Sequence, residues 1–221
     1  MPIFIPVLIA GFSVASAAIL KRQLRKPLRL VVLGQRTTGK SLLINSWQGE
    51  WATPPATNTP VKITPIRIDT GEKVLNIEKK FIFKTFHDIS GRDEPITTNG
   101  NELDRAEAVL YLVKATTLFD EERRTAGHGQ HTEWVRVQLD AARLADRATA
   151  ARRVVIVVTH ADLDPRSDTL PWERYCDHVA KQLAHVCAAI GPPDKTRVVV
   201  GSLADPERAA TLTNDIIGSL L

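Results

Sequence analysis

The stretch GQRTTGKS at residues 34–41 constrains this chain more than any other part of its sequence. It follows the apolar run LRLVVL at residues 28–33, which predicts a buried strand, and SLLINSWQ at residues 41–48 predicts a helix. Glycines in such a strand–loop–helix unit let backbone N–H groups turn inward around phosphate oxygens, and the helix N-terminus adds partial positive charge. The stretch therefore predicts a phosphate-binding loop made of Gly34, Gln35, Arg36, Thr37, Thr38, Gly39, Lys40 and Ser41.

Two side chains at the end of this loop have expected roles in binding a nucleoside triphosphate. The ammonium group of Lys40 is expected to reach the β- and γ-phosphates. The hydroxyl of Ser41 is expected to bind the accompanying Mg²⁺ ion. Because the pattern stands between a predicted strand and a predicted helix, it indicates nucleotide binding.

Short apolar runs and helical periods alternate along the rest of the chain. Strands are expected at residues 61–69, 74–86, 108–113, 153–160 and 197–202, with DTGEK at residues 69–73 as a turn. Pro65 predicts an edge position for the first of these strands, because proline donates no hydrogen bond to a neighbour. A last helix is expected from about residue 206 to 217.

Two apolar stripes with the helical period predict helices that pack on the sheet. They are formed by Trp134, Val137, Ala141, Leu144, Ala145 and Ala148, and by Trp172, Tyr175, Val179, Leu183, Val186 and Ile190. Strands that alternate with helices predict a three-layer α/β domain over residues 28–221. Its sheet is expected to have six strands, mostly parallel, with one antiparallel edge strand.

Residues 1–27 are expected to form a separate hydrophobic segment with a basic flank. Residues 3–20 carry no charge and would span about 27 Å as a helix, close to the thickness of a bilayer core. A cleaved signal peptide and a soluble helix are the alternatives, but no positive region precedes the apolar part. The positive flank at residues 21–29 favours a single-pass membrane anchor with residues 30–221 in the cytoplasm.

The charge of the chain argues against a nucleic-acid partner. The formal net charge is +4, and residues 21–29 alone contribute +5 through Lys21, Arg22, Arg25, Lys26 and Arg29. The remainder of the chain therefore carries about −1. A broad basic face for nucleic acid is not implied.

Three further short motifs follow predicted strands in order. HDISG at residues 87–91 offers Asp88 for the Mg²⁺ shell and the Gly91 N–H for the γ-phosphate. VVTHAD at residues 157–162 ends in Asp162, whose carboxylate can accept hydrogen bonds from guanine N1 and N2. VVVGSLA at residues 198–204 places Ser202 to brace Asp162 and the Leu203 N–H to reach guanine O6.

With these four motifs in order, residues 28–221 resemble the Ras-like GTPases of the translation-factor-related class of P-loop NTPases. GQRTTGKS, DISG, THAD and GSLA stand for the phosphate, switch II, base and base-support motifs of that family. The resemblance implies binding of GTP or GDP with Mg²⁺ and switch loops that change on hydrolysis. It also implies a switch I threonine in ATNTP, with Thr59 the first choice and Thr57 the second.

The sequence departs from the family pattern at catalytic and base-binding positions. Arg36 replaces a glycine common in small GTPases, where it either crowds the attacking water or acts as an arginine finger in cis. Arg92 replaces the usual water-orienting glutamine, and a guanidinium has no acceptor for a water proton. Thr159 and His160 replace the Asn–Lys pair, so the stacking lysine is missing.

These departures predict slow intrinsic GTP hydrolysis or hydrolysis completed by a protein partner at the switch loops. The first function hypothesis is therefore a membrane-anchored regulatory GTPase. The second is a GTP-loaded scaffold that hydrolyses little and recruits a protein partner to the membrane. An ATP-using kinase or ATPase is disfavoured, because adenine cannot supply the donors that Asp162 would accept.

Overall fold

The structure is a computed structural model. It describes residues 28–35, 37–47, 61–63, 66–74, 77–88, 103–119, 133–148, 151 and 153–220. The predicted anchor at residues 3–20 and its basic flank up to residue 27 lie outside this set. Among the described residues, no helix has both the length and the apolar character needed to cross a membrane.

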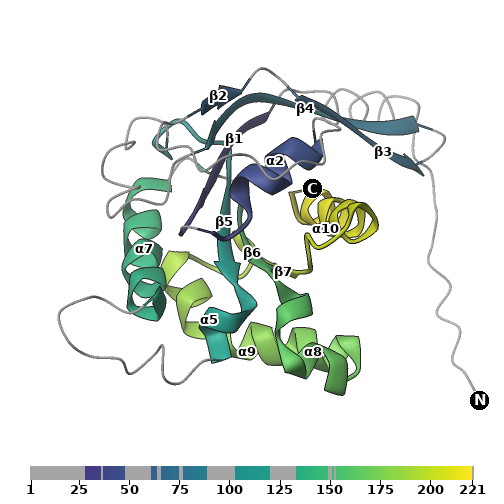
Figure 1. The fold of residues 1–221 in the computed structure, drawn as a ribbon. Helices are drawn as coiled ribbons and strands as arrows, with labels where there is room; N and C mark the ends of the chain where they lie inside the picture. Colours follow the sequence, from purple (N-terminus) through teal and green to yellow (C-terminus); the bar gives the residue numbers. More distant parts are fainter. Residues whose placement is uncertain are drawn as a thin grey trace, which may run out of the picture.

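The described strands form one seven-stranded sheet in the order β2-β4-β1-β5-β6-β7, with β3 also paired to β4 (Figure 1). The strands are β1 Leu28–Gly34, β2 Val61–Ile63, β3 Ile66–Val74, β4 Ile77–Asp88, β5 Ala108–Lys114, β6 Arg153–Thr159 and β7 Thr196–Val200. β4, β1, β5, β6 and β7 pair in parallel, whereas β2 and β3 run antiparallel to β4. The mostly parallel α/β sheet expected from the sequence is therefore present.

The antiparallel edge differs from the prediction in two respects. The single strand expected at residues 61–69 is two strands, β2 and β3, so the sheet has seven described strands rather than six. Pro65 lies in the sequence between them and cannot donate a ladder hydrogen bond. DTGEK is not the turn: residues 69–73 lie within β3, where the register shifts between Asp69 and Lys73. The long β4 opposite them supplies pairing partners, so the turn-like residues are accommodated as an irregularity.

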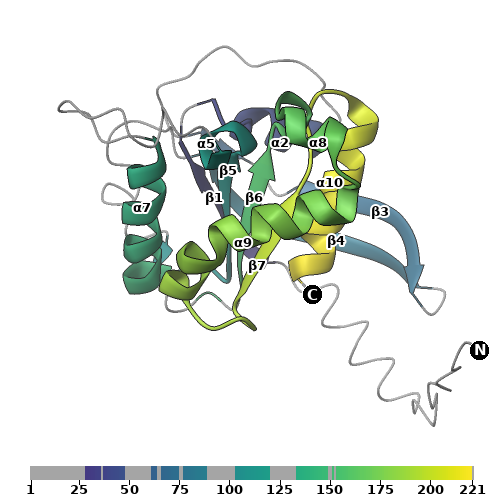
Figure 2. The same cartoon turned by 90° about the horizontal axis from the view of Figure 1, so that it is seen from below.

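Helices follow β1, β5, β6 and β7 along the chain. They are α2 Lys40–Trp47, α5 Ala115–Phe119, α7 Glu133–Arg147, the 3₁₀ turn η2 Ala161–Leu163, α8 Pro165–Thr169, α9 Trp172–Ile190 and α10 Pro206–Leu220. α7 and α9 contact each other on one face of the sheet, and α2 and α10 contact each other on the other face. Figure 2 shows α7 and α9 side by side from below, with α10 on the far side of β7. The domain is thus three layers, as expected.

Alternate residues of each parallel strand enter different cores. In β1, Val31 and Leu33 pack with α7 and α9, whereas Leu30 and Val32 pack with α2 and α10. This two-sided burial explains why the strands are continuous apolar runs rather than alternating ones. Trp47 lies in the core formed with α2 and α10, and its indole N–H donates to the Thr213 hydroxyl of α10 at 2.9 Å.

Both predicted helical stripes differ in detail from the buried faces, and Ala145 of the first stripe is only half-buried. Trp172 is 47% exposed rather than packed, because it is the first residue of α9 and its ring lies beside Tyr175 at the edge of the core. In α7 the buried face also includes Asp140, which the apolar pattern omitted. Its carboxylate accepts a hydrogen bond from the Tyr111 hydroxyl at 2.8 Å. Burial raises the pKa of Asp140, opposed by that hydrogen bond and by Arg143.

Candidate functional site

The loop between β1 and α2 is the one that the sequence predicts to bind phosphate, and its backbone has unusual dihedral angles. Gly34 has φ 143° and Gly39 has φ 84°, both in the region that favours glycine. A Cβ atom at Gly34 would lie 2.4 Å from the Leu112 carbonyl oxygen, so glycine allows β1 to approach β5 this closely. Thr37 also adopts a left-handed conformation, with φ 59°. The loop is therefore a strained turn that ends at the N-terminus of α2.

Lys40 is the first residue of α2, and its side chain is 6% exposed. The ammonium group donates to the carbonyl oxygens of Gly34 at 2.9 Å and Gln35 at 2.6 Å. The lysine therefore folds back across its own loop instead of extending into solvent. A buried ammonium at a helix N-terminus is a strong local site for an anion.

The phosphate loop is held against the THAD segment at the end of β6. The Thr159 hydroxyl donates to the Thr38 carbonyl oxygen at 2.9 Å. A Cβ atom at Gly39 would lie 2.8 Å from Leu203 Cδ1 and 3.9 Å from His160 Cε1. Residues from three separate motifs therefore surround one glycine. The predicted phosphate loop, base segment and base-support segment therefore lie next to one another in the fold.

Asp162 and Ser202 pair as the sequence analysis expected. The Ser202 hydroxyl donates a hydrogen bond to Oδ1 of Asp162, and the Ala204 N–H donates to the Ser202 hydroxyl oxygen at 3.0 Å. The two loops are also joined by their backbones, since the Ala161 N–H donates to the Gly201 carbonyl oxygen at 3.2 Å. The Asp162 carboxylate, in the middle of η2, is thus held in a fixed orientation.

His160 stands where the family pattern has a lysine. It has φ 58°, and its Nδ1 lies 2.9 Å from the Thr159 hydroxyl oxygen. Burial lowers the pKa of His160, opposed by the charge of Asp162 and reinforced by Lys114. Because its ordinary pKa already lies below 7, the imidazole is neutral at physiological pH. At this position the site therefore has a flat, uncharged imidazole ring instead of the aliphatic chain of a lysine.

Several predicted site residues lie outside the described part of the chain: Arg36, Thr57, Thr59, Gly91 and Arg92. Asp88 is the last residue of β4, in register with Val32 of β1. Its backbone is thus beside the strand that enters the phosphate loop. Ser41 follows Lys40 in the first turn of α2.

A contact that no sequence motif indicates joins the phosphate loop to α7. The Gln35 side-chain amide donates to the Glu133 carbonyl oxygen at 2.6 Å. The Glu133 carboxylate accepts from the Thr117 hydroxyl at 2.8 Å and lies 3.8 Å from the Lys114 ammonium. Glu133 therefore joins the phosphate loop to β5, α5 and α7. No local pattern could have indicated this, because Gln35 and Glu133 are 98 positions apart.

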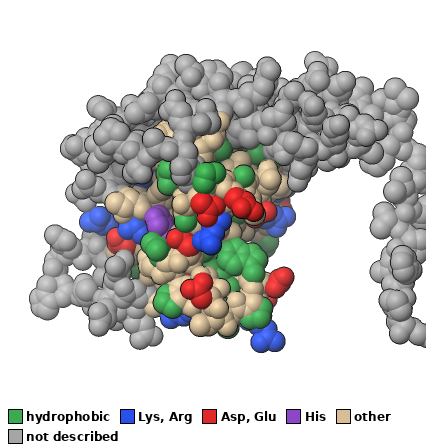
Figure 3. Space-filling view, turned by 45° about the vertical axis from the view of Figure 1, so that its right-hand side comes forward, with side chains coloured by type: hydrophobic (Ala, Val, Ile, Leu, Met, Phe, Trp, Pro, Cys, Tyr) green, Lys and Arg blue, Asp and Glu red, His purple; other side chains and the backbone are tan. Residues whose placement is uncertain are grey.

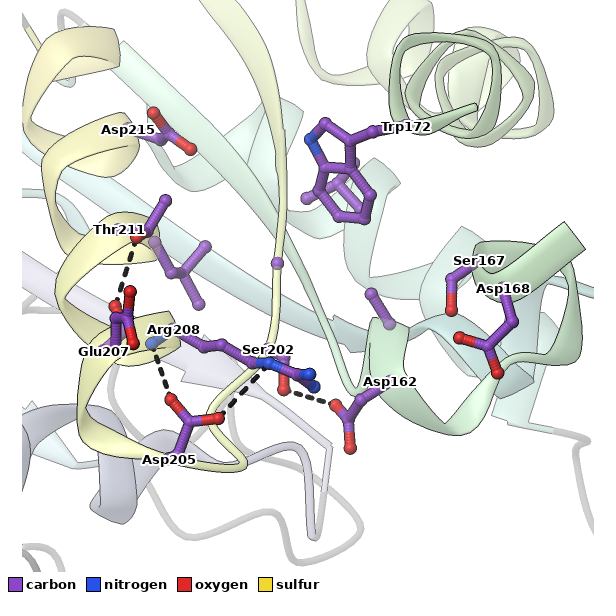
Figure 4. Close-up of a pocket in the computed structure, with 14 residues that line it drawn as sticks. Asp162, Ser167, Asp168, Trp172, Ser202, Asp205, Glu207, Arg208, Thr211 and Asp215 are labelled. Atoms are coloured by element: carbon purple, nitrogen blue, oxygen red, sulfur yellow. Dashed lines mark hydrogen bonds and ion pairs between the residues drawn. The ribbon is translucent and has the colours of Figure 1, made fainter. Parts of the chain in front are cut away.

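A hollow of about 730 Å³ lies beyond the base segment, between the start of α9 and α10 (Figure 4). Asp162 and Ser202 lie on one side of it, and Trp172 lies across from α10. The other charged side chains lining it are Asp168, Asp205, Glu207, Arg208 and Asp215. In space-filling view, acidic side chains gather on this side of the molecule around a basic one (Figure 3). Lys40 does not line this hollow, so a phosphate tail bound at Lys40 would lie outside it.

The sequence matches no known family model and no curated protein sequence. Among solved structures, the chain is similar to translation elongation factor SelB from Methanococcus maripaludis, solved in complex with the GTP analogue GPPNHP. The two share 16% sequence identity with a TM-score of 0.50, over 88% of this chain and 34% of the SelB chain. This chain therefore matches only about a third of the length of that factor. At this identity the likeness shows the fold alone.

Proposed function

We propose that this chain binds GTP and GDP and acts as a nucleotide-dependent switch with slow or partner-assisted hydrolysis. The observation that carries the proposal is that the side chains of His160 and Leu203 both lie close to Gly39 of the phosphate loop. One nucleotide can then place its phosphates at Lys40 and its base at Asp162. The SelB structure, which shares this fold, holds a GTP analogue.

Guanine is the base that fits the Asp162–Ser202 pair best. Guanine presents two neighbouring donors, N1–H and the 2-amino group, to a carboxylate, whereas adenine presents an acceptor at N1. The Ser202 hydroxyl occupies one lone pair of Oδ1 and leaves the other oxygen positions of Asp162 for the base. The backbone N–H of Leu203 is the group proposed to meet guanine O6.

A Mg²⁺ ion is proposed at the start of α2, held by the Ser41 hydroxyl, by Asp88 through water and by Thr59. When bound there, the ion would neutralise charge on the β- and γ-phosphate oxygens. Lys40 contributes a second positive charge to the same oxygens. Arg36, Gly91 and Arg92 are proposed to face the γ-phosphate, Gly91 through its N–H and Arg36 as a charge that either crowds or stabilises the reacting group.

The experiment that tests this function is identification of the nucleotide that copurifies with the full-length protein, followed by single-turnover hydrolysis. We expect guanine nucleotide, and a GTP hydrolysis rate of about 10⁻⁴ s⁻¹ or slower, because Arg92 cannot accept a proton from the attacking water. Equal competition by ATP would contradict the guanine assignment. A much faster rate would contradict slow hydrolysis, and stoichiometric GTP without turnover would select the scaffold alternative.

We also propose that residues 3–20 anchor the chain in a membrane, with the nucleotide-binding domain in the cytoplasm. The support is the uncharged stretch and the positive flank that follows it. The full-length protein is expected to need detergent to stay in the supernatant after ultracentrifugation. The double substitution Ile9→Arg and Val14→Arg is expected to abolish membrane association, since each arginine costs roughly 2.5–3.5 kcal/mol at the centre of a span. If the unsubstituted protein stays in the supernatant without detergent, the anchor is wrong.

A further inference from the structure

A second aspartate, two residues after Asp162, is buried, and both of its carboxylate oxygens accept hydrogen bonds. The Asp164 carboxylate is only 2% exposed. Oδ1 accepts from the Arg166 backbone N–H at 3.1 Å and lies 3.4 Å from the Arg166 guanidinium. Oδ2 accepts from the Tyr175 hydroxyl at 3.2 Å. A carboxylate is costly to bury unless its oxygens accept hydrogen bonds, so these contacts are what make its position tenable.

Asp164 is the joint between the turn that carries Asp162 and helix α8. Its N–H donates to the Ala161 carbonyl oxygen at 3.1 Å and closes η2. Its side chain caps α8, whose first residue is Pro165. Leu163, between the two aspartates, is 60% exposed and gives the turn no apolar anchor. The position of Asp162 therefore depends on Ser202 on one side and on Asp164 on the other.

Tyr175 connects this joint to the core. It is fully buried in α9, and burial together with the Asp164 charge raises the pKa of its hydroxyl, so it remains a donor. Phe119 at the end of α5 packs against the same joint, 4.5 Å from the Arg166 guanidinium and 6.4 Å from the Tyr175 ring. The cap of α8 is thus enclosed by side chains of three helices.

We propose that Asp164, held by Tyr175, is a positioning residue that sets the Asp162 carboxylate for recognition of the purine 2-amino group. The inference rests on the proposed guanine site and adds a specificity determinant to it. Asp164 does not touch the base. It acts by fixing the backbone of η2, so that Asp162 meets both guanine donors rather than one.

The test is the ratio of affinities for GTP and ITP, measured on the full-length protein by equilibrium binding. ITP lacks the 2-amino group, so this ratio reports the second hydrogen bond that Asp162 accepts. A hydrogen bond to a charged group predicts a preference for GTP of roughly ten- to a hundredfold in the unsubstituted protein. Asp164→Ala is expected to reduce that preference about fivefold or more, by weakening GTP more than ITP. A merely structural role would weaken both nucleotides by the same factor.

The chain offers a matched control in Asp140. This carboxylate is also buried, at 5% exposure, and it also accepts from a tyrosine hydroxyl, that of Tyr111. It lies in α7, away from the base segment. Asp140→Ala is therefore expected to lower stability without changing the GTP/ITP ratio. Asp164→Asn, which keeps an oxygen that can cap α8, is expected to keep the ratio within about twofold of the unsubstituted value.

Two further variants keep the proposal testable. If Asp164→Ala does not fold, Tyr175→Phe removes one of the donors to Asp164 and is expected to lower the ratio about threefold, while Tyr111→Phe leaves it unchanged. In an Asp162→Ala background, Asp164→Ala is expected to cause no further change, because it acts through Asp162.

Retention of the full GTP/ITP preference by Asp164→Ala or, if that variant does not fold, by Tyr175→Phe would overturn the positioning role. An equal loss in Asp140→Ala would overturn it too. Failure of the guanine site itself looks different: the unsubstituted protein would then show no preference for GTP over ITP, or Asp162→Ala would leave the preference intact. That result would overturn both proposals together.

Discussion

Lys40→Ala is expected to abolish nucleotide binding. The Lys40 ammonium is held inside the phosphate loop by the carbonyl oxygens of Gly34 and Gln35, at the N-terminus of α2. In the proposed complex it would contact two phosphates. Each hydrogen bond from a charged group contributes about 1.5–3 kcal/mol, so two predict a loss of roughly 10²–10⁴-fold in affinity. Isothermal titration of the purified, nucleotide-stripped protein with GTP measures this directly.

A matched control separates the charge from its structural contacts. Lys195 also donates to a backbone carbonyl oxygen, that of Ala148 at 3.0 Å, but it precedes β7 at the opposite end of that strand from Ser202. Lys195→Ala is expected to bind GTP as the unsubstituted protein does. Tight GTP binding by a folded Lys40→Ala variant would contradict the phosphate-loop assignment.

The parts of the fold that the sequence predicted are those set by local pattern. The parallel strands are apolar runs buried on both faces, and the phosphate loop needs glycines at positions that the backbone conformation dictates. The prediction of a single edge strand was wrong. Pro65 stands in the sequence between β2 and β3 and cannot donate a ladder hydrogen bond. The residues of DTGEK, predicted to form a turn, pair with β4 instead. α5 and α8 have five residues each, too few for a helical period to be recognised.

In the site, the sequence could predict a contact between two side chains where both belong to motifs of the family it resembles. The Ser202–Asp162 hydrogen bond is such a case. The contacts of Gln35 with Glu133 and of Asp164 with Tyr175 were not predicted. The first joins distant parts of the chain, and the second requires knowing how α9 packs on η2. The Asp–Pro pair at residues 164–165 does indicate a helix cap, but a cap signal alone does not identify the tyrosine that holds it.

Asp162→Asn is expected to change the base preference from guanine to xanthine. Guanine offers two donors to the carboxylate of Asp162. Xanthine has a carbonyl oxygen where guanine has its 2-amino group, so it offers one donor and one acceptor. An asparagine amide complements that pair and mismatches guanine. Loss of one or two charge-assisted hydrogen bonds predicts a fall in GTP affinity of about a hundredfold, with a comparable gain for XTP.

Competition of GTP and XTP against a fluorescent nucleotide would measure the exchange of preference. The asparagine side chain keeps an oxygen that can accept from the Ser202 hydroxyl, so the loop geometry is retained and the effect is specific to the base. Asp168→Asn is the control, because Asp168 is exposed and lines the hollow beyond the base segment. It is expected to keep the preference for GTP. If Asp162→Asn still prefers GTP while Asp168→Asn does not, then the base binds in the hollow next to Asp168 and Asp162 does not recognise it.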